Sequence, residues 1–525
     1  MDNRKKRRVL LGGGITAVAV VVAGAIAVWP STPDRVAATS TGTPTVAPPG
    51  PDVVAREFTA ALAAGGDAAR STDAPQAAKP VIDGVRKGMA GAVFSSVLAA
   101  PKRVSDDVAT VAADYTWRLP SGAPLTYDEQ LELRLADNHW RVHWSPAVLH
   151  PQLGENQSLT YAKTTADGAV RGRDGTPVAT GFAPQVMTQV TKVAVDTTGT
   201  TGYRVAVVDA AGAPVTVLAE QKAEPGKTYT VTLDPKVQAA AQTAVDGVAL
   251  GSAIVAIQPS TGDVLAVAQN SAASAQGTIA TTNFFEPGST FKIVTATAAL
   301  TAGTATADTP LACPGEASIG TRTIINENRF DLGTVPLHTA FAASCNTTFA
   351  KLAAELPPSA LTEAAARFGL GLDYQVAGLT TNTAKVPAAA TVPERVESGI
   401  GQGTVQVTPF GMALAAATVA RGSIPVPQLV REIPTTGGAT TALPGGVVAA
   451  LRSMTGEVVT GGTARDLAGY GGVHGKTGTA QVGDGTTAHG WFVGYQGDVA
   501  FAVLVVLGGS SKAAVSVTAS FLNGL

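Results

Sequence analysis

The stretch Glu286-Pro287-Gly288-Ser289-Thr290-Phe291-Lys292 ends an irregular segment and begins an apolar helix that is expected over residues 291–302. The Pro-Gly pair interrupts regular structure, and the helix starts directly after it. Ser289 and Lys292 are three residues apart, so they are neighbours on one helical face and the amine can take the hydroxyl proton. A single Ser-x-x-Lys is weak evidence, because such a serine is often only a helix cap and such a lysine is often solvated.

Two later motifs complete a set with this serine and lysine. Ser344-Cys345-Asn346 follows Ser289 by about 55 residues, and Lys476-Thr477-Gly478-Thr479 follows it by about 190 residues. The order and spacing of Ser-x-x-Lys, Ser-x-Asn and Lys-Thr-Gly are typical of the serine enzymes that react with penicillin. On these motifs the chain resembles the penicillin-binding proteins. Flanking phrases of that family extend the resemblance over about residues 228–525: Leu233-Asp234 with Gln238, Ile257-Gln258-Pro259-Ser260-Thr261-Gly262, Gly401-Gln402-Gly403 with Thr408-Pro409, and Gly490-Trp491-Phe492-Val493-Gly494-Tyr495.

The resemblance implies a catalytic role for the four residues that define the first two motifs. Ser289 is expected to be the nucleophile and Lys292 its base, because burial and the nearby cation Lys476 both favour a neutral amine. Ser344 is expected to pass the proton to the leaving nitrogen, and Asn346 to offer its amide to the substrate backbone. We expect no metal and no cofactor, since the histidines lack metal-ligand spacing and two cysteines exclude a Cys-rich zinc site.

The Lys-Thr-Gly-Thr segment is expected to bind the carboxylate that ends the donor peptide. Lys476 on an edge strand would supply positive charge, and Thr477 and Thr479 would supply hydroxyls. Gly478 has no side chain, which would let the substrate approach the strand closely. The backbone N–H groups of Ser289 and Thr479 are the expected oxyanion hole.

Other reactive side chains near these motifs have simpler interpretations. Cys345 is interpreted as a packing residue rather than a second nucleophile. Whether it pairs with Cys313 stays open, because two buried thiols and a disulfide both fit an exported chain. His474 and His489 are interpreted as ordinary sheet residues. Glu286 is interpreted as a solvated turn residue rather than a general acid.

The first fifty residues predict a membrane anchor and a spacer. Residues 1–8 carry five basic side chains, and residues 9–29 carry no charge, so the latter are long enough to span a bilayer with the basic end inside. A cleaved signal peptide is the alternative, because Ala25-Ile26-Ala27 has small residues at the spacing of a cleavage site. Residues 30–52 are rich in Pro, Thr, Ser and Gly and predict a linker. We expect a single-pass protein of the bacterial cell membrane with an extracytoplasmic catalytic domain.

Three folded domains are expected after this linker, which makes the chain an α+β multidomain protein. The phrase Trp144-Ser145-Pro146 with His150-Pro151-Gln152-Leu153 resembles the end of the NTF2-like MecA N-terminal domain. The phrase Arg171-Gly172-Arg173-Asp174-Gly175 is similar to the one that opens the pedestal of class B penicillin-binding proteins. The expected boundaries are 53–152 for the NTF2-like domain, 153–234 for a β-rich pedestal, and 235–525 for the transpeptidase domain.

Hydrophobic periodicity predicts the main elements of these domains. Turn residues separate the strand patterns, and Ala-rich helical patterns lie between two hairpins of the last domain. One antiparallel sheet built from both ends of that domain and flanked by helices accounts for this order. The expected helices are 53–64, 291–302 and 447–460, and the expected strands are 108–119, 125–135, 140–144, 202–208, 228–233, 252–257, 263–268, 490–495 and 499–507.

Composition and charge exclude several other classes of protein. The chain has 525 residues, 45% of them hydrophobic and 14% charged, which is too apolar for a disordered protein. With 37 basic and 39 acidic residues, it has no positive field that could hold a nucleic acid.

The expected function is a peptidoglycan D,D-transpeptidase that cross-links stem peptides and is acylated by β-lactams. A D,D-carboxypeptidase would use the same residues, with water in place of the acceptor amine. A catalytically idle wall-synthesis scaffold and a β-lactam sensor are alternatives of another class. No segment between Ser344 and Lys476 has the Glu-x-x-Leu-Asn phrase of a β-lactamase, and none in the chain resembles a glycosyltransferase. The glycan strands are therefore expected to come from a partner, a membrane glycan polymerase.

Overall fold

The computed structural model describes residues 48–439, 442–483 and 485–525. The cytoplasmic tail and the membrane anchor expected at residues 1–29 lie outside these ranges, as does most of the expected linker. Within the described part of the chain, no helix has both the length and the apolar character needed to cross a membrane.

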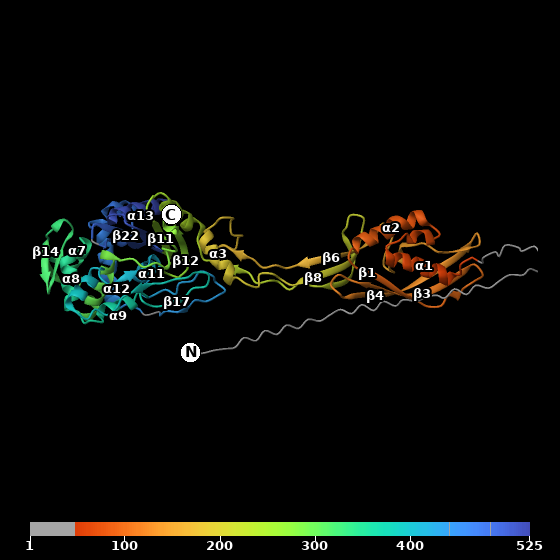
Figure 1. Ribbon diagram of the computed structural model, residues 1–525, viewed down its shortest axis with the longest axis horizontal. Helices are drawn as coiled ribbons and strands as arrows, with labels where there is room; N and C mark the ends of the chain where they lie inside the picture. The colour runs from red at the N-terminus through yellow and green to blue at the C-terminus, as the bar shows by residue number, and fades with distance from the viewer. Residues whose placement is uncertain (1–47, 440–441, 484) are drawn as a thin grey trace, which may run out of the picture.

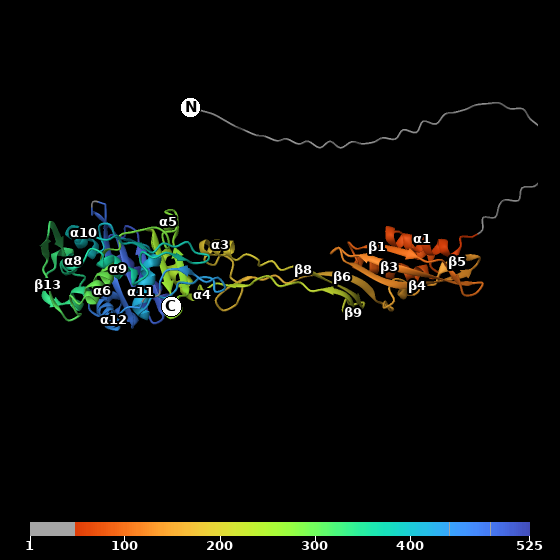
Figure 2. The same ribbon diagram turned by 90° about the horizontal axis from the view of Figure 1, so that it is seen from below.

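The described chain is elongated, with a smaller unit at one end and a larger unit at the other (Figures 1 and 2). A three-stranded antiparallel sheet leads from the smaller unit toward the larger one, with the order β6 (Ser158–Thr165), β8 (Thr201–Val208) and β9 (Pro214–Gln221). The smaller unit comes from the N-terminal half of the chain, and the larger unit contains all three sequence motifs.

The N-terminal unit packs helices on a five-stranded antiparallel sheet. Helix α1 (Pro51–Ala64) has a proline in its first turn and ends at Gly65, which is left-handed at φ 72° as a helix-terminating glycine often is. The long pair β3 (Val108–Arg118) and β4 (Pro124–Ala136) carries alternate buried side chains, so the predicted helix and strands are confirmed here. The remaining elements are η1 (Ala68–Ser71), α2 (Pro75–Gly88), β1 (Val93–Leu98), β2 (Lys102–Arg103), β5 (His139–Val142) and η2 (Pro146–Val148).

The middle region contributes to both units. Strand β8 confirms the strand expected at 202–208, and its Val205 and Val207 belong to the N-terminal core. The strand expected at 228–233 is wrong in length, since only β10 (Tyr229–Thr230) is paired as a strand. The physical reason is that the next residue, Val231, makes an isolated bridge to Val430 of the larger unit. The remaining elements are β7 (Val170–Arg171), α3 (Pro184–Val193) and β9 (Pro214–Gln221), and α3 was not predicted.

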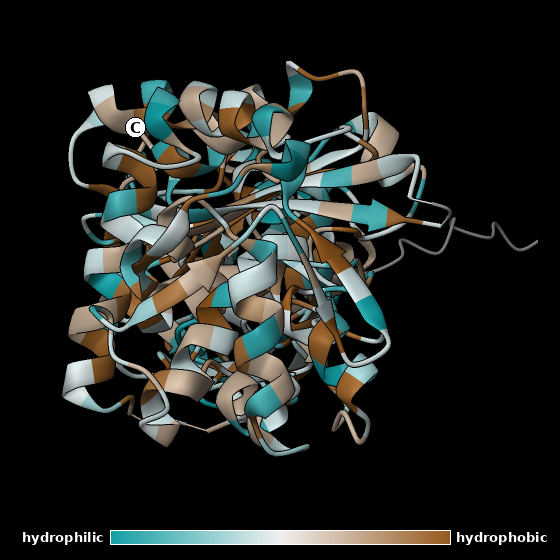
Figure 3. Cartoon of the chain, turned by 90° about the vertical axis from the view of Figure 1, so that its left-hand side faces the viewer, coloured by the Kyte–Doolittle hydropathy of each residue, from teal (hydrophilic) through white to brown (hydrophobic). Residues whose placement is uncertain are grey.

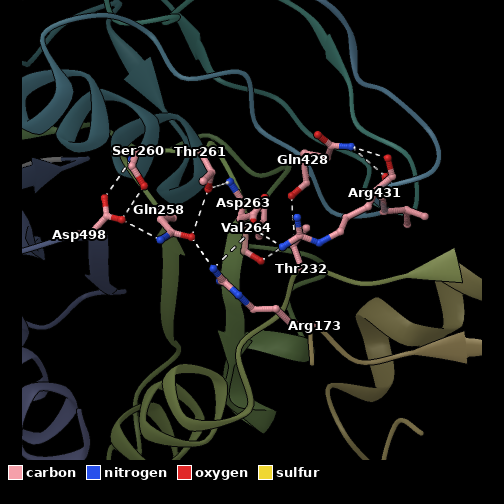
Figure 4. Close-up of polar contacts among 11 residues, drawn as sticks. Arg173, Thr232, Gln258, Ser260, Thr261, Asp263, Val264, Gln428, Arg431 and Asp498 are labelled. Atoms are coloured by element: carbon pink, nitrogen blue, oxygen red, sulfur yellow. Dashed lines mark hydrogen bonds and ion pairs between the residues drawn. The ribbon is translucent and has the colours of Figure 1, made fainter. Parts of the chain in front are cut away.

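A polar cluster joins the Arg-Gly-Arg-Asp-Gly phrase to the larger unit (Figure 4). Arg173 donates to Gln258 Oε1 at 2.5 Å and lies 3.6 Å from Asp263, which is also paired with Arg431 at 2.8 Å. Asp498 accepts from Gln258 Nε2 at 2.7 Å. We call these five residues the Asp263 cluster.

The larger unit is built on a five-stranded antiparallel sheet with the order β12-β11-β23-β22-β21. The first and last segments of the unit therefore meet in one sheet, as predicted. Both predicted hairpins are present, with ends that differ by up to three residues from the predicted ones. The strands are β11 (Ser252–Ile257), β12 (Val264–Gln269), β21 (Val473–Val482), β22 (Thr487–Gln496) and β23 (Val499–Val505).

Helices lie on both sides of this sheet (Figure 3). Helix α6 (Lys292–Ala302) is buried along most of its length, and α12 (Gly445–Thr460) ends beside β21, so both predicted helices are confirmed. The other helices are α4 (Pro235–Asp246), α5 (Ser271–Ser274), η3 (Gly288–Phe291), η4 (Glu327–Arg329), α7 (Leu337–Ala342), α8 (Asn346–Glu355), α9 (Ala360–Ala366), α10 (Val392–Gly399), α11 (Pro409–Arg421), η5 (Arg465–Tyr470) and α13 (Ser511–Gly524). Short strands complete the unit: β13 (Pro310–Cys313), β14 (Glu316–Ile319), β15 (Arg322–Ile325), β16 (Gly333–Pro336), β17 (Tyr374–Gln375), β18 (Ala384–Lys385), β19 (Gln406–Val407) and β20 (Thr436–Gly437).

Candidate active site

Ser289 lies on the short 3-10 helix η3, directly before α6. In a 3-10 turn, side chains three residues apart are nearly eclipsed, which places Lys292 on the same side as Ser289. The turn is pressed against β21, because a Cβ on Gly288 would lie 2.6 Å from the carbonyl oxygen of Thr479. Gly288 also has φ 51°, and its N–H donates to the carbonyl of Gly401 at 2.9 Å. A glycine directly before Ser289 is thus required by both space and backbone conformation.

Lys292 is fully buried, and the acceptors that the described residues offer to its amine are neutral. Its Nζ lies 2.7 Å from the Ser344 carbonyl oxygen, 3.3 Å from Ser344 Oγ and 2.7 Å from Asn346 Oδ1. Burial lowers the pKa of Lys292 well below its ordinary value, and the charge of Lys476 lowers it further. Both effects favour the neutral amine that a general base needs.

Lys476 lies on β21 and is also fully buried. Its Nζ donates to Ser344 Oγ at 2.9 Å and to the Thr477 carbonyl at 3.1 Å. Burial lowers the pKa of Lys476 to about 7. The Ser344 hydroxyl is therefore bonded to the amines of both Lys292 and Lys476. We call Lys292, Ser344, Asn346 and Lys476 the two-lysine cluster.

The Ser-x-Asn motif spans the junction between α7 and α8. Ser344 has φ 63°, an uncommon conformation for a residue with a side chain, and its hydroxyl faces the two amines in that conformation. Cys345 is fully buried and forms a disulfide with Cys313 of β13, which decides between the two alternatives left open by the sequence. Asn346 also donates its Nδ2 to the Ile325 carbonyl at 2.9 Å, so one amide hydrogen remains for a substrate.

The remaining residues of the Lys-Thr-Gly-Thr motif follow Lys476 along β21, beside the two-lysine cluster. Thr477 is 3% exposed, and its hydroxyl lies 2.6 Å from that of Thr463. Thr479 Oγ1 accepts from the N–H of Ser511 at 3.1 Å. A Cβ on Gly478 would lie 2.7 Å from the carbonyl oxygen of Pro287, so its missing side chain makes room for the turn that carries Ser289. All the site residues expected from the sequence are thus gathered around one strand edge.

Comparison with known families shows which family the chain belongs to. The model of the penicillin-binding protein transpeptidase domain matches residues 252–524, which is more than half of the chain. The chain belongs to the penicillin-binding protein transpeptidases. An NTF2-like N-terminal transpeptidase domain, the MecA N-terminal type, matches residues 50–157 and confirms the expected nature of the first unit.

The relatives and solved structures described next match between 55% and 69% of this penicillin-binding protein. It is 31% identical over 346 residues to the peptidoglycan D,D-transpeptidase PbpA of Mycolicibacterium smegmatis, covering 55% of this chain and 69% of the relative. It is 26% identical to penicillin-binding protein A from M. tuberculosis in a penicillin G acyl-enzyme complex, with a TM-score of 0.50 over 58% of this chain and 82% of that chain. The fold is also that of the D,D-transpeptidase domain of a peptidoglycan glycosyltransferase from Eggerthella lenta, with 23% identity and a TM-score of 0.53 over 69% of this chain and 98% of that chain.

The penicillin-binding protein has histidines near its motif strand, as the sequence indicated, and both have structural partners. His489 is 5% exposed and accepts the Leu507 N–H on Nδ1 at 3.1 Å, and its Nε2 lies 3.9 Å from Glu286. Burial lowers the pKa of His489, and Glu286 opposes that shift. His474 stacks on Tyr495 with ring centroids 4.9 Å apart. Among the described residues, neither histidine bonds to the Ser289 hydroxyl.

Two residues of this site had no role assigned from the sequence. Gln402, oriented so that both its amide atoms are satisfied, pairs with the backbone of Gln481 at 3.1 and 3.3 Å. It therefore caps the free edge of β21 just beyond Thr479. Thr463 contacts Thr477, as described above. Gln402 stands in a recognisable Gly-Gln-Gly phrase, whereas Thr463 lies in a Gly- and Thr-rich turn that carries no distinctive pattern.

Proposed function

We propose that this chain cross-links peptidoglycan stem peptides through an ester on Ser289, and that β-lactams form the same ester. As a member of its family the chain is a serine D,D-transpeptidase of the cell envelope. The observation that carries the residue assignment is the Ser344 hydroxyl, which accepts at 3.3 Å from Lys292 and at 2.9 Å from Lys476, beside the turn of Ser289.

Acylation begins when neutral Lys292 takes the proton of Ser289, whose oxygen attacks the carbonyl of the penultimate D-Ala. The backbone N–H groups of Ser289 and Thr479 stabilise the oxyanion. The C–N bond then breaks, and the proton passes from Lys292 through Ser344 to the departing nitrogen of the terminal D-Ala. The Ser344 hydroxyl suits this transfer because it already bonds to the Lys292 amine at 3.3 Å.

The second step is attack on the ester by an amine from a neighbouring stem peptide. Ser289 leaves and regains its proton, while the new amide joins the two stems. In a β-lactam the expelled nitrogen stays attached to the acyl group and blocks the approach of the amine. The related protein captured with penicillin G as an acyl-enzyme supports this part of the proposal.

Recognition of the donor carboxylate falls to Lys476, Thr477 and Thr479. The free edge of β21 offers backbone groups to an extended peptide, and Gln402 closes that edge beyond Thr479. A donor peptide that pairs with the edge therefore ends beside the Lys476 amine.

The membrane part of the proposal rests on the sequence alone. Residues 9–29 are the proposed single-pass anchor, which holds the catalytic unit outside the membrane. A membrane glycan polymerase is the proposed partner, because this chain supplies cross-links and must receive glycan strands from elsewhere.

Labelling with a fluorescent penicillin tests the catalytic proposal. The wild-type chain should take up one covalent label, and Ser289→Ala should take up none while its thermal unfolding is unchanged, because only one half-buried hydroxyl is lost. A label that persists in Ser289→Ala would assign the nucleophile to another residue. Mass analysis of the labelled peptide would identify that residue.

A further inference from the structure

The segment after α12 contacts both the Lys-Thr-Gly-Thr motif and the end of α7, which leads into the Ser-x-Asn motif. The N–H of Thr463 donates to the carbonyl of Ala342 at 3.2 Å, two residues before Ser344. The hydroxyl of the same residue lies 2.6 Å from the hydroxyl of Thr477. We infer that Thr463 is a positioning residue that sets the Thr477 hydroxyl, and with it carboxylate recognition, relative to the Ser-x-Asn motif. This inference rests on the proposed function.

The approach of this segment to α7 is as close as a backbone allows. A Cβ on Gly462 would lie 2.4 Å from the Ala342 carbonyl oxygen and 2.9 Å from the Val458 Cα, so a side chain at this position would force the two segments apart. The contact also satisfies the last carbonyl of α7, which has no partner inside its own helix. Thr463 is therefore held by its backbone before its side chain makes any contact.

A second link fixes the end of α12 to α7. His338 Nδ1 lies 2.6 Å from Glu457 Oε2, and both side chains are about one-third exposed. The Glu457 carbonyl accepts the N–H of Gly461 at 3.0 Å, where α12 ends. The turn that carries Thr463 is thus anchored on a helix that is itself attached to α7. A hydroxyl supported in this way can orient its neighbour, because it has little freedom of its own.

The contact between the Thr463 and Thr477 hydroxyls also determines which proton is available to a substrate at β21. A hydroxyl has one proton to donate and two lone pairs. When Thr463 donates to Thr477, the Thr477 proton is left for a substrate carboxylate. The Thr477 carbonyl meanwhile accepts from Lys476 at 3.1 Å, so the amine and the hydroxyl converge at one residue. Without the Thr463 hydroxyl, Thr477 can rotate its proton away from the carboxylate.

The test compares acylation of the full chain by penicillin G and by its methyl ester, which lacks the carboxylate. Thr463→Val should lower the second-order rate about tenfold for penicillin G and less than about twofold for the ester, as expected for one lost charge-assisted contact. Thr463→Ser keeps the hydroxyl and should restore the rate. Thr460→Val is the matched control, because Thr460 is an exposed residue at the end of α12.

The ratio of the two rates decides the outcome. A merely structural role would lower both acylation rates equally and leave their ratio unchanged. An unchanged ratio in Thr463→Val would therefore overturn the inference. If valine unfolds the protein, Thr463→Ala removes the same hydroxyl with a smaller side chain, and the same ratio applies. Failure of the proposed function would look different, since wild-type protein would then not be acylated on Ser289 at all.

Discussion

The two-lysine cluster and the Asp263 cluster bury charge in opposite ways. In the two-lysine cluster, Lys292 and Lys476 are both fully buried, and every hydrogen-bond acceptor that the described residues offer them is neutral. Each amine therefore loses its hydration without gaining a counter-ion. The pKa of each is lowered for that reason, first by burial and, for Lys292, then by its neighbour.

The Asp263 cluster instead surrounds a buried anion with cations. Asp263 is 4% exposed and is paired with Arg431 at 2.8 Å and Arg173 at 3.6 Å. The three residues come from three separate segments, so their pairing holds the middle region on the larger unit (Figure 4). A buried charge without a counter-ion has a shifted pKa that suits a reactive group, but it lowers the stability of the fold. A buried charge with counter-ions instead holds two parts of the chain together.

The largest expected effect comes from replacing Lys292 by methionine. Loss of the base should lower acylation by at least about a thousandfold, because a nucleophile and its base act as one unit. The free energy of unfolding should rise, since an unpaired buried amine is replaced by an apolar side chain of similar size. Penicillin labelling and denaturant unfolding measure the two effects. Lys351→Met, at an exposed position on α8, is the control. A parallel fall of activity and stability would contradict this view of the cluster.

Deprotonation of Lys476 should have opposite effects on carboxylate binding and on the stability of the fold. With a pKa of about 7 against an ordinary value of 10.5, the folded protein binds fewer protons than the unfolded chain between those values. The free energy of unfolding should therefore rise with pH across that window, and this slope should be smaller in Lys476→Met. Over the same window the neutral amine loses its attraction for a carboxylate.

Acylation rates check the second half of that expectation. The rate ratio of penicillin G to its methyl ester should fall as pH rises above about 7 in the wild type. In Lys476→Met the ratio should be low and independent of pH. A ratio that stays constant in the wild type would show that Lys476 does not bind the carboxylate.

A medium effect is expected at the other cluster. Asp263→Ala leaves Arg173 and Arg431 facing each other without their anion, which should lower the free energy of unfolding by about 2 kcal/mol; this is less than for a fully buried pair because the arginines are partly exposed. Acylation of the folded protein should be unchanged. Asp83→Ala removes an exposed partner of Lys79 and should cost less than about 0.5 kcal/mol. A loss of acylation in folded Asp263→Ala would mean that the two clusters act together.

The motifs predicted which residues meet at the candidate site, because each motif combines particular side chains at a particular separation. Ser289 and Lys292 are one turn apart, and the two predicted hairpins, β11 with β12 and β22 with β23, show alternation and turn residues. Such local signals are visible in one sequence. The antiparallel sheet formed from both ends of the unit followed from the same signals.

Contacts between distant segments could not be predicted in this way. The disulfide of Cys313 and Cys345 depends on how β13 lies against α8, and 32 residues separate the two cysteines. The strand expected at 228–233 was shortened because Val231 found its partner in Val430, about two hundred residues later. Thr463 contacts Thr477 only because α12 ends against α7.

The smallest expected effect lies at the rim of the Asp263 cluster. Asp498 is exposed and accepts from Ser260 N at 2.9 Å and from Gln258 Nε2 at 2.7 Å. Burial acts to raise the pKa of Asp498, but the hydrogen bonds from Ser260 and Gln258 outweigh it, so the pKa is lowered from 3.8. A carboxylate with a lowered pKa stabilises the fold at neutral pH and loses that contribution as pH falls through its folded value.

Asp498→Asn keeps the shape and one acceptor oxygen, so at neutral pH it should cost less than about 1 kcal/mol. Urea unfolding at pH 7 and at pH values below the 3.8 of an unperturbed aspartate should show this difference shrinking toward zero as Asp498 is protonated. Asp263→Ala should remain destabilising at pH 7 by a larger margin, because its partners are charged and Asp263 is buried. An Asp498→Asn cost that equals the Asp263 cost, or that does not change with pH, would mean that the rim and the centre of the cluster are held by the same interactions.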